Sequence, residues 1–81
     1  MKAIRTRFLG ATNYRGSRVI ASDNDGNTAT VSYDHALNSS DAHSQAARAL
    51  CSKMGWKGEL TVGDFDHGYV FVWSNDAKIT V

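Results

Sequence analysis

Residues 38–55, NSSDAHSQAARALCSKMG, are the stretch that decides the fold. The short polar side chains from Asn38 to Asp41 can accept hydrogen bonds from the free amides of a first helical turn, and Asp41 suits the positive end of the helix dipole. Gly55 is well placed to end the helix, because glycine readily adopts the left-handed conformation of a helix terminus. The stretch therefore predicts one helix that starts at these polar residues and runs to about Met54.

Small apolar residues recur along this helix on one side, which predicts a face that lies close to a sheet. The expected inner stripe consists of Ala42, Ala46, Ala49, Leu50, Lys53 and Met54, and Ala47 and Cys51 widen it.

The segment before the helix has the two-residue period of β-strands. In residues 2 to 9, two outward-pointing arginines, Arg5 and Arg7, alternate with residues that face a core, namely Ile4, Thr6 and Phe8. Ser17 to Asp23 and Thr28 to Tyr33 show further strand patterns, and the Asp, Asn and Gly residues at 23–27 are typical of a tight hairpin turn. These residues predict a three-stranded meander.

Two more strands are expected after the helix, at Glu59 to Val62 and at Tyr69 to Trp73, joined by a loop over residues 63–68. The second of them is apolar on both faces, which favours a central place in the sheet. Residues 75–81 are expected either to add an edge strand through Ile79 and Val81 or to fray.

This order of elements, β-β-β-α-β-β, predicts an α+β two-layer sandwich in which one helix covers one face of an antiparallel sheet of about five strands. A chain of 81 residues is long enough for one domain with one core.

The single cysteine, Cys51, excludes an internal disulfide and favours the cytoplasm. The opening residues lack the apolar core of a signal peptide, and no apolar run is long enough to span a bilayer, so no membrane association is expected.

Charge is segregated along the chain although the formal net charge is only +1. The first eighteen residues hold five cations and no acid, whereas residues 19–47 hold four aspartates and no Lys or Arg. Such a run can create a local positive face even in a chain that is neutral as a whole. The alternative is a solvated strand whose arginines pair with Asp23, Asp25 or Glu59.

The residues expected to bind a protein partner combine arginines with an aromatic in a glycine-flanked loop, a combination typical of binding hot spots. They are Arg5, Arg7, Tyr14, Arg15 and Arg18. The working hypothesis is a non-enzymatic interaction protein that acts by steric or electrostatic blocking.

A nucleic-acid partner is the alternative. Residues 68–72 partly resemble the longer ribonucleoprotein motif of RNA recognition domains, in which aromatics of a central strand stack on bases. His67, Val70 and Ser74 depart from that motif, and that fold needs two helices. A single-stranded nucleic-acid site would use Arg5, Arg7, Tyr69 and Trp73. The competing interpretation places Tyr69, Phe71 and Trp73 in the core or over the second face of the sheet.

No metal, cofactor or catalytic site is expected. His35, His43, His67 and Cys51 are the good soft metal ligands, but they lack the close spacing of a zinc site. Residues 23–26 resemble a calcium loop only superficially, because the glycine comes too early. Cys51 and the histidines suggest no nucleophile with a base beside it, and no glycine-rich phosphate loop is present.

Three segments carry a resemblance to known proteins: residues 1–22, with Thr12, Asn13 and Arg15 to Arg18, residues 39–56, and residues 68–72. Together they resemble a family of small uncharacterised bacterial proteins of prophages, plasmids and integrated elements. Size and layout are also similar to small anti-CRISPR proteins, which implies binding and inhibition of a host defence complex. A structural or oligomerising module, such as a homodimer that buries an edge strand, is the third hypothesis.

Overall fold

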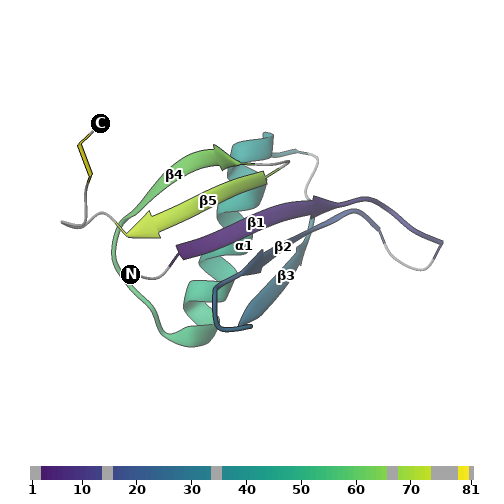
Figure 1. Cartoon of the computed structure of the whole chain (residues 1–81). Helices are drawn as coiled ribbons and strands as arrows, with labels where there is room; N and C mark the ends of the chain where they lie inside the picture. Colours follow the sequence, from purple (N-terminus) through teal and green to yellow (C-terminus); the bar gives the residue numbers. More distant parts are fainter. Residues whose placement is uncertain (1–2, 14–15, 34–35, 66–67, 74–78, 81) are drawn as a thin grey trace.

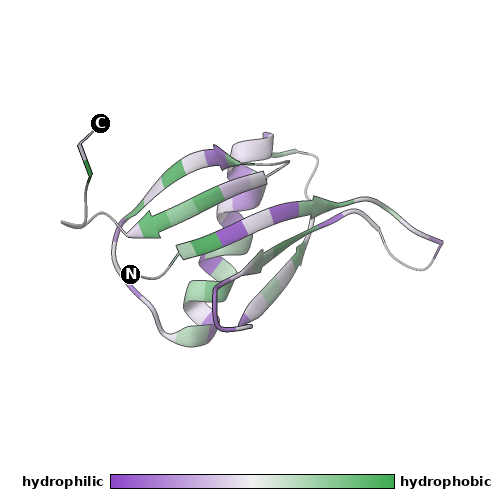
Figure 2. Ribbon diagram, in the orientation of Figure 1, coloured by the Kyte–Doolittle hydropathy of each residue, from purple (hydrophilic) through white to green (hydrophobic). Residues whose placement is uncertain are grey.

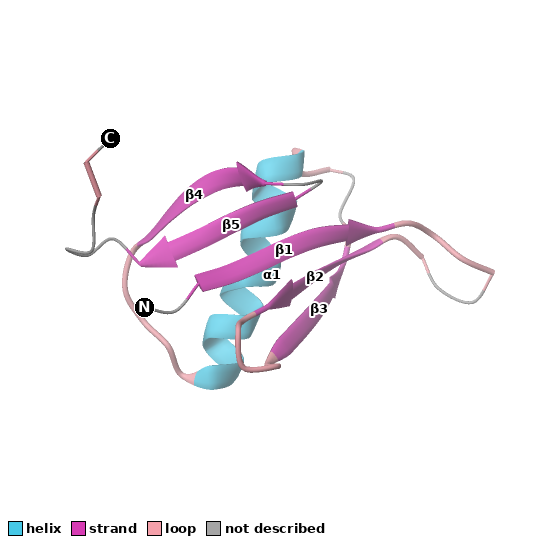
Figure 3. Ribbon diagram, in the orientation of Figure 1, coloured by secondary structure: helices cyan, strands magenta, loops and turns pink. Residues whose placement is uncertain are grey.

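The computed structural model describes residues 3–13, 16–33, 36–65, 68–73 and 79–80. In this part of the chain, five strands form one antiparallel sheet and one helix packs against it (Figures 1 and 3). In chain order the elements are β1 (Ala3–Leu9), β2 (Arg18–Ser22), β3 (Thr28–Ser32), α1 (Ser39–Met54), β4 (Leu60–Phe65) and β5 (Gly68–Trp73). This confirms the predicted α+β fold with its β-β-β-α-β-β order.

The strands lie in the order β3-β2-β1-β5-β4. The first three form the expected meander, and the chain then crosses the sheet through α1, so that β5 returns beside β1 and β4 lies outside it. β5 is therefore an interior strand, as its apolar side chains predict, while β1 is the central one. β3 and β4 form the two edges of the sheet.

The alternation along β1 separates two faces of the sheet. Ile4 and Thr6 are buried beneath the helix, and Arg5 and Arg7 between them are exposed on the other side. Figure 2 shows this alternation as hydrophilic and hydrophobic bands along β1, whereas β5 is largely hydrophobic. The predicted outward direction of the two arginines is thus confirmed.

The helix begins and ends where its capping residues predict. The Asn38 side chain accepts a hydrogen bond from the backbone N–H of Asp41 at 2.8 Å, which satisfies one free amide of the first turn. At the other end Gly55 has a φ of 74°, and the backbone N–H groups of Gly55 and Trp56 donate to the carbonyls of Ser52 and Cys51. Local chemistry therefore fixes both ends of α1.

The core lies between α1 and the helix side of the sheet. The residues of α1 that are buried there are Ala42, His43, Ala46, Ala47 and Leu50, which face Ile4, Val19, Ala21 and Phe71 of the sheet. Two details of the predicted stripe are wrong: Lys53 is exposed, and His43, which was not assigned to the stripe, is buried. A hydrogen bond to the sheet satisfies this histidine, as described below, and makes its burial tolerable.

The helix does not cover the sheet evenly. It crosses behind the sheet (Figure 3) and packs against β3, β2, β1 and, less closely, β5, but not against β4. Alanine at three buried positions of α1 lets the helix approach the narrow side chains of β2 and β3 closely. One edge of the sheet is therefore backed by the helix and the other is not.

The hairpin of β4 and β5 has longer strands than expected. Gly63, Asp64 and Phe65 were assigned to a loop, but they continue β4 and pair with Val70, Tyr69 and Gly68. Ladder pairing has overridden the low strand propensity of glycine and aspartate. Gly68 itself is required by a close approach, because a Cβ atom there would overlap the carbonyl group of Thr6 on β1.

The predicted edge strand at residues 75–81 falls mainly outside the described residues. Ile79 and Thr80, which are described, lie outside the sheet, and Ile79 is 88% exposed. Within the described part of the chain, no helix has the length and apolar character needed to cross a membrane.

Candidate binding face of the sheet

The side of the sheet opposite α1, called the open face here, carries three arginines. Arg5 and Arg7 project from β1, and Arg18 projects from β2, where it lies opposite Leu9. The rest of the face is mainly hydroxyl-bearing and apolar residues, which include Ala3, Leu9, Ile20, Ser22, Thr28, Thr30, Ser32, Thr61, Phe65, Val70 and Val72. No helix covers this side among the described residues (Figure 1).

The three arginines lie in three successive rows of the β1–β2 pair. In the register, Arg5 lies opposite Ser22, Arg7 opposite Ile20, and Leu9 opposite Arg18. Successive rows on one face of a strand are separated by about 7 Å, so the arginines form a line about 14 Å long. A shallow depression lies along its first half, lined by Arg5, Arg7, Ile20, Ser22 and Thr28.

An aromatic side chain lies beside this line. The Arg5 guanidinium carbon lies 5.6 Å from the centre of the Phe65 ring, within range of a cation–π interaction. Phe65 remains 55% exposed. This aromatic was missed because Gly63 and Asp64 interrupt the sequence pattern, although Thr61, Gly63 and Phe65 do keep the two-residue period of one strand face.

Described acidic side chains lie near the sheet at two places, on the helix side of β4 and in the β2–β3 turn. Among the described strand residues the one acid is Asp64, which pairs with Tyr69 and therefore lies on the helix side. The aspartates of the β2–β3 turn lie next to Ser22, at the Arg5 end of the line. The Asp23 carboxylate accepts bonds there from the backbone N–H groups of Asp25 and Asn27, both at 2.9 Å, and from the Asn27 side chain at 2.8 Å. These bonds hold the hairpin turn.

The residues expected to bind a protein partner are brought together in part. Arg5, Arg7 and Arg18 share the open face, and the Arg18 guanidinium also donates to the carbonyl of Gly16 at 3.4 Å. Tyr14 and Arg15 lie outside the described residues.

The residues expected for a nucleic-acid site are separated. Tyr69 pairs with Thr6, and Trp73 is in the same alternating set, so both lie on the helix side, opposite to Arg5 and Arg7. The Tyr69 ring packs edge-on against His43 at 4.7 Å, and the Trp73 indole N–H donates to the Lys57 carbonyl at 2.8 Å. These two arginines and two aromatics therefore do not share one face, because a strand directs successive side chains to opposite faces. Phe65 is the aromatic that joins the arginines.

His43 and Cys51 lie in environments that favour a structural role. The Thr6 hydroxyl and His43 Nδ1 share a hydrogen bond of 2.8 Å, and burial lowers the pKa of His43. Burial raises the pKa of the Cys51 thiol, which favours the thiol over the nucleophilic thiolate. Among the residues the structure describes, no three His, Cys, Asp or Glu side chains converge on a point that could hold a metal ion.

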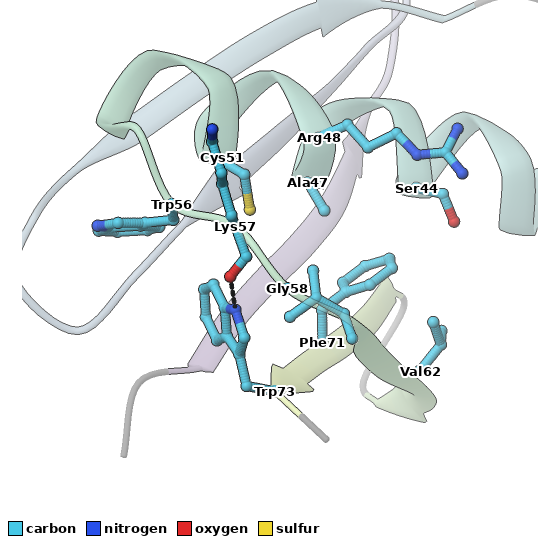
Figure 4. Close-up of a pocket in the computed structure, with 11 residues that line it drawn as sticks. Ser44, Ala47, Arg48, Cys51, Trp56, Lys57, Gly58, Val62, Phe71 and Trp73 are labelled. Carbon is cyan, nitrogen blue, oxygen red and sulfur yellow. Dashed lines mark hydrogen bonds between the residues drawn. The ribbon is translucent and has the colours of Figure 1, made fainter. Parts of the chain in front are cut away.

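A second concave feature, the α1–β4 groove, lies on the helix side where α1 stops short of β4 (Figure 4). Its floor is apolar and includes Leu60, Val62, Phe71 and Trp73, and Trp56 packs edge-on against Trp73 at 5.9 Å. Ala47 and Cys51 form the helix wall, and Ser44, Arg48, Lys57 and Gly58 complete the lining. Sequence patterns did not indicate this groove, because it depends on the lateral position of the helix.

Comparisons of the chain with protein-family models, with curated proteins and with solved structures give no match. The resemblance to proteins of mobile elements therefore stays an expectation, and the functional argument depends on the faces of the molecule itself.

Proposed function

We propose that this protein is a non-enzymatic binding protein that docks its open face onto an acidic surface of a protein partner. The observation that supports this most directly is the arrangement of the charged residues of the strands. Arg5, Arg7 and Arg18 lie on the open face, and the single acid among the described strand residues, Asp64, lies on the other. Arginine and aromatic side chains also dominate the energetics of protein interfaces.

The composition of the open face favours a protein over a long nucleic acid. Ile20, Val70 and Val72 are only partly exposed and give the arginine line an apolar border, as in the core and rim of a protein interface. The formal net charge of +1 is also far below that of a typical nucleic-acid-binding domain. Electrostatic attraction would then act locally and set orientation and association rate.

The mode of action we propose is occlusion. A five-stranded sheet is a rigid platform. When it binds a partner, other molecules can no longer reach the covered surface of that partner, and no covalent bond is made or broken. The resemblance to small proteins of mobile elements supports a host macromolecular complex, such as a defence complex, as the target. Cytoplasmic action follows from the same proposal.

The test removes the arginine line and compares it with an equal loss of charge elsewhere. Arg5→Ser/Arg7→Ser/Arg18→Ser is expected to reduce recovery of a specific partner from a bacterial lysate by about tenfold or more. Arg48→Ser/Lys53→Ser/Lys57→Ser removes the same number of cations from the other side and is the control. Both variants are checked for folding by circular dichroism, and partners are identified by mass spectrometry. Equal retention of the partner by the two triple variants would refute the proposal.

Binding of single-stranded nucleic acid is the second candidate, and the position of Phe65 favours it. An exposed ring beside arginines on a sheet face is a platform on which a base can stack. The lysate experiment is therefore run with and without nuclease. Recovery that depends on intact nucleic acid, falls steeply with salt and is lost in Phe65→Ala would favour this candidate over the protein partner.

A further inference from the structure

The α1–β4 groove leaves apolar surface open to solvent in a concave site. Phe71 at its floor is buried. The other large apolar side chains of the groove are at least partly exposed, namely Trp56, Leu60, Val62 and Trp73. Apolar side chains that gather around a concavity, with a few polar groups at its rim, are typical of a ligand site. The groove has a volume of about 260 Å³, just below the range of about 300–1,000 Å³ that holds drug-sized molecules, so it suits a smaller ligand.

Three neighbours hold the Trp73 ring of this groove in place. The indole N–H donates to the Lys57 carbonyl at 2.8 Å, which fixes the direction of the ring. Gly58 has a φ of 125°, and a Cβ atom there would lie 2.9 Å from Trp73 Cδ1, so the bare backbone packs directly on the indole. Trp56 packs edge-on against the same ring at 5.9 Å. The groove thus has a preformed aromatic wall, against which another aromatic ring can pack in an offset or edge-on geometry.

The helix forms the other wall of the groove and carries its polar groups. The helix residues that line it recur at spacings of three and four, which makes them one stripe of α1: Ser44, Ala47, Arg48 and Cys51. Figure 4 shows the Arg48 side chain extended along the helix toward Ser44. The Lys57 side chain is directed toward the helix and ends near Cys51. Both cations therefore lie at the helix rim of the groove.

The charges around the groove favour an anionic ligand. Among the described residues that line it, two are cations and none is an acid. Asp64 lies on the helix side of β4 beyond Val62, outside the lining, so a negative group is favoured at the helix rim and disfavoured at that end of β4. The planar guanidinium of Arg48 matches the two oxygens of a carboxylate, and the Lys57 ammonium adds a second positive charge. The groove therefore complements a molecule that combines an apolar ring with one carboxylate.

We propose that the α1–β4 groove binds a small aromatic carboxylate, with the ring against Trp73 and Phe71 and the carboxylate at the helix rim. Burial of the ring covers apolar surface that is otherwise in water, and the rim cations select the acid. A ligand of about a dozen non-hydrogen atoms in an open groove is expected to bind in the micromolar to millimolar range. The inference is independent of the proposed function, because the groove lies on the helix side of the sheet and the arginine line lies on the open face.

The chain contains its own reporters for this binding. Its two tryptophans, Trp56 and Trp73, both line the groove, and its single cysteine, Cys51, has its sulfur directed toward it (Figure 4). Hydrocinnamate is the probe, and hydrocinnamide, which has the same shape without the charge, is its matched control. Hydrocinnamate is expected to change the tryptophan fluorescence saturably and to slow alkylation of the thiol. Its dissociation constant is expected to be about threefold to tenfold below that of the amide.

Charge removal tests the role of the rim. Arg48→Gln/Lys57→Gln is expected to weaken hydrocinnamate binding to the level of the amide, because only the acid uses the two cations. Arg7→Gln/Arg18→Gln removes the same charge from the open face and is the control, expected to keep the preference for the acid. Added salt is expected to weaken binding of the acid and to leave binding of the amide nearly unchanged.

Filling the groove tests its place in the fold. Val62→Phe puts a larger side chain into the groove from an exposed position, and it is expected to weaken both ligands by about tenfold or more. Thr30→Phe adds a ring to the opposite edge strand, on the open face, and is expected to leave binding unchanged. Circular dichroism and thermal melting verify that the variants are folded.

Several results would overturn the proposal. They are the absence of a saturable response to hydrocinnamate at millimolar concentration, equal binding of the acid and the amide, and binding that Val62→Phe leaves intact or that Thr30→Phe alone abolishes. The triple variant Arg48→Ser/Lys53→Ser/Lys57→Ser separates this inference from the proposed function. It is expected to lose the preference for the acid and to retain the lysate partner, whereas Arg5→Ser/Arg7→Ser/Arg18→Ser is expected to do the reverse.

Discussion

At one edge of the sheet β3 lies against the helix, and Lys53 donates to the carbonyl of Thr28; at the other edge β4 lies beyond the helix, with Val62 45% exposed. Both strands belong to the same antiparallel sheet, and both are short. The difference arises because α1 lies to one side of the sheet. Whether an edge strand is protected from pairing with another strand therefore depends on the elements and side chains packed against it, in addition to its own backbone.

The lateral position of the helix has a cause in side-chain size. Over β2 and β3 the facing residues are small or β-branched, including Ala21, Ala29 and Val31, and the alanines of α1 approach them closely. On the β4 and β5 side, the bulky Trp56 and Trp73 pack against each other instead of beneath the helix. The small residues allow the helix to pack closely over β2 and β3, and the large aromatic side chains leave a groove between the helix and β4.

The largest expected effect is a loss of unfolding free energy, and it should differ between the core beneath the helix and the β4 edge. Leu50 is fully buried, so Leu50→Ala is expected to lower the free energy of unfolding by about 2–5 kcal/mol through lost burial and a cavity. Val62→Ala, at 45% exposure, is expected to cost less than about 1 kcal/mol. Urea denaturation at low protein concentration measures both changes. Similar losses for the two variants would show that the halves are not protected differently.

A smaller effect is expected from pH, again confined to the covered half. Burial lowers the pKa of His43 in the folded protein, so the unfolded chain binds a proton more readily. Stability is then complete above the ordinary histidine pKa of about 6.5 and declines as pH falls below it, by at most about 1.4 kcal/mol per pH unit for one proton. The slope ends once pH has fallen through the lowered pKa. Denaturation curves from neutral to acidic pH measure it.

The control for this pH dependence is His43→Gln, which does not titrate and retains a polar group near Thr6. The difference between the two profiles isolates His43 from the other histidines of the chain. A variant with an unchanged acid slope would contradict the assignment of that slope to His43.

The smallest expected effect concerns the capped edge. Lys53→Ala removes an exposed hydrogen bond to Thr28, and we expect a stability loss of less than about 1 kcal/mol. The more informative result is association: once its cation is removed, β3 is expected to self-associate weakly, which sedimentation velocity detects. Arg7→Ala removes an equal charge from the central strand, away from both edges, and is the control. An unchanged association state would mean that the helix alone protects this edge.

Sequence patterns were most informative where local chemistry decides the outcome. Asn38 and Gly55 marked the two ends of α1, and the alternation of residues 2 to 9 gave the correct direction of Arg5 and Arg7. The patterns were less informative where pairing overrides propensity. Gly63 and Asp64 continue β4 because β5 pairs with them, and no local signal indicates this.

The candidate sites show the same division. That Arg5, Arg7 and Arg18 share a face follows from strand alternation and register, and the first two were expected from the sequence. That Tyr69 and Trp73 face the helix depends on how β5 aligns with β1, which no residue of β5 specifies alone. The burial of His43 likewise depends on Thr6, a residue 37 positions away, which satisfies its ring nitrogen.

The sequence by itself determined the element types, the helix limits and the two-faced character of β1, because caps and two-residue periods act over a few neighbouring residues. Tertiary structure alone decided which edge the helix covers, which aromatic joins the arginines and where the α1–β4 groove opens. These features depend on strand register and on the packing of side chains distant in sequence. The interactions that stabilise them form only when the helix packs against the sheet.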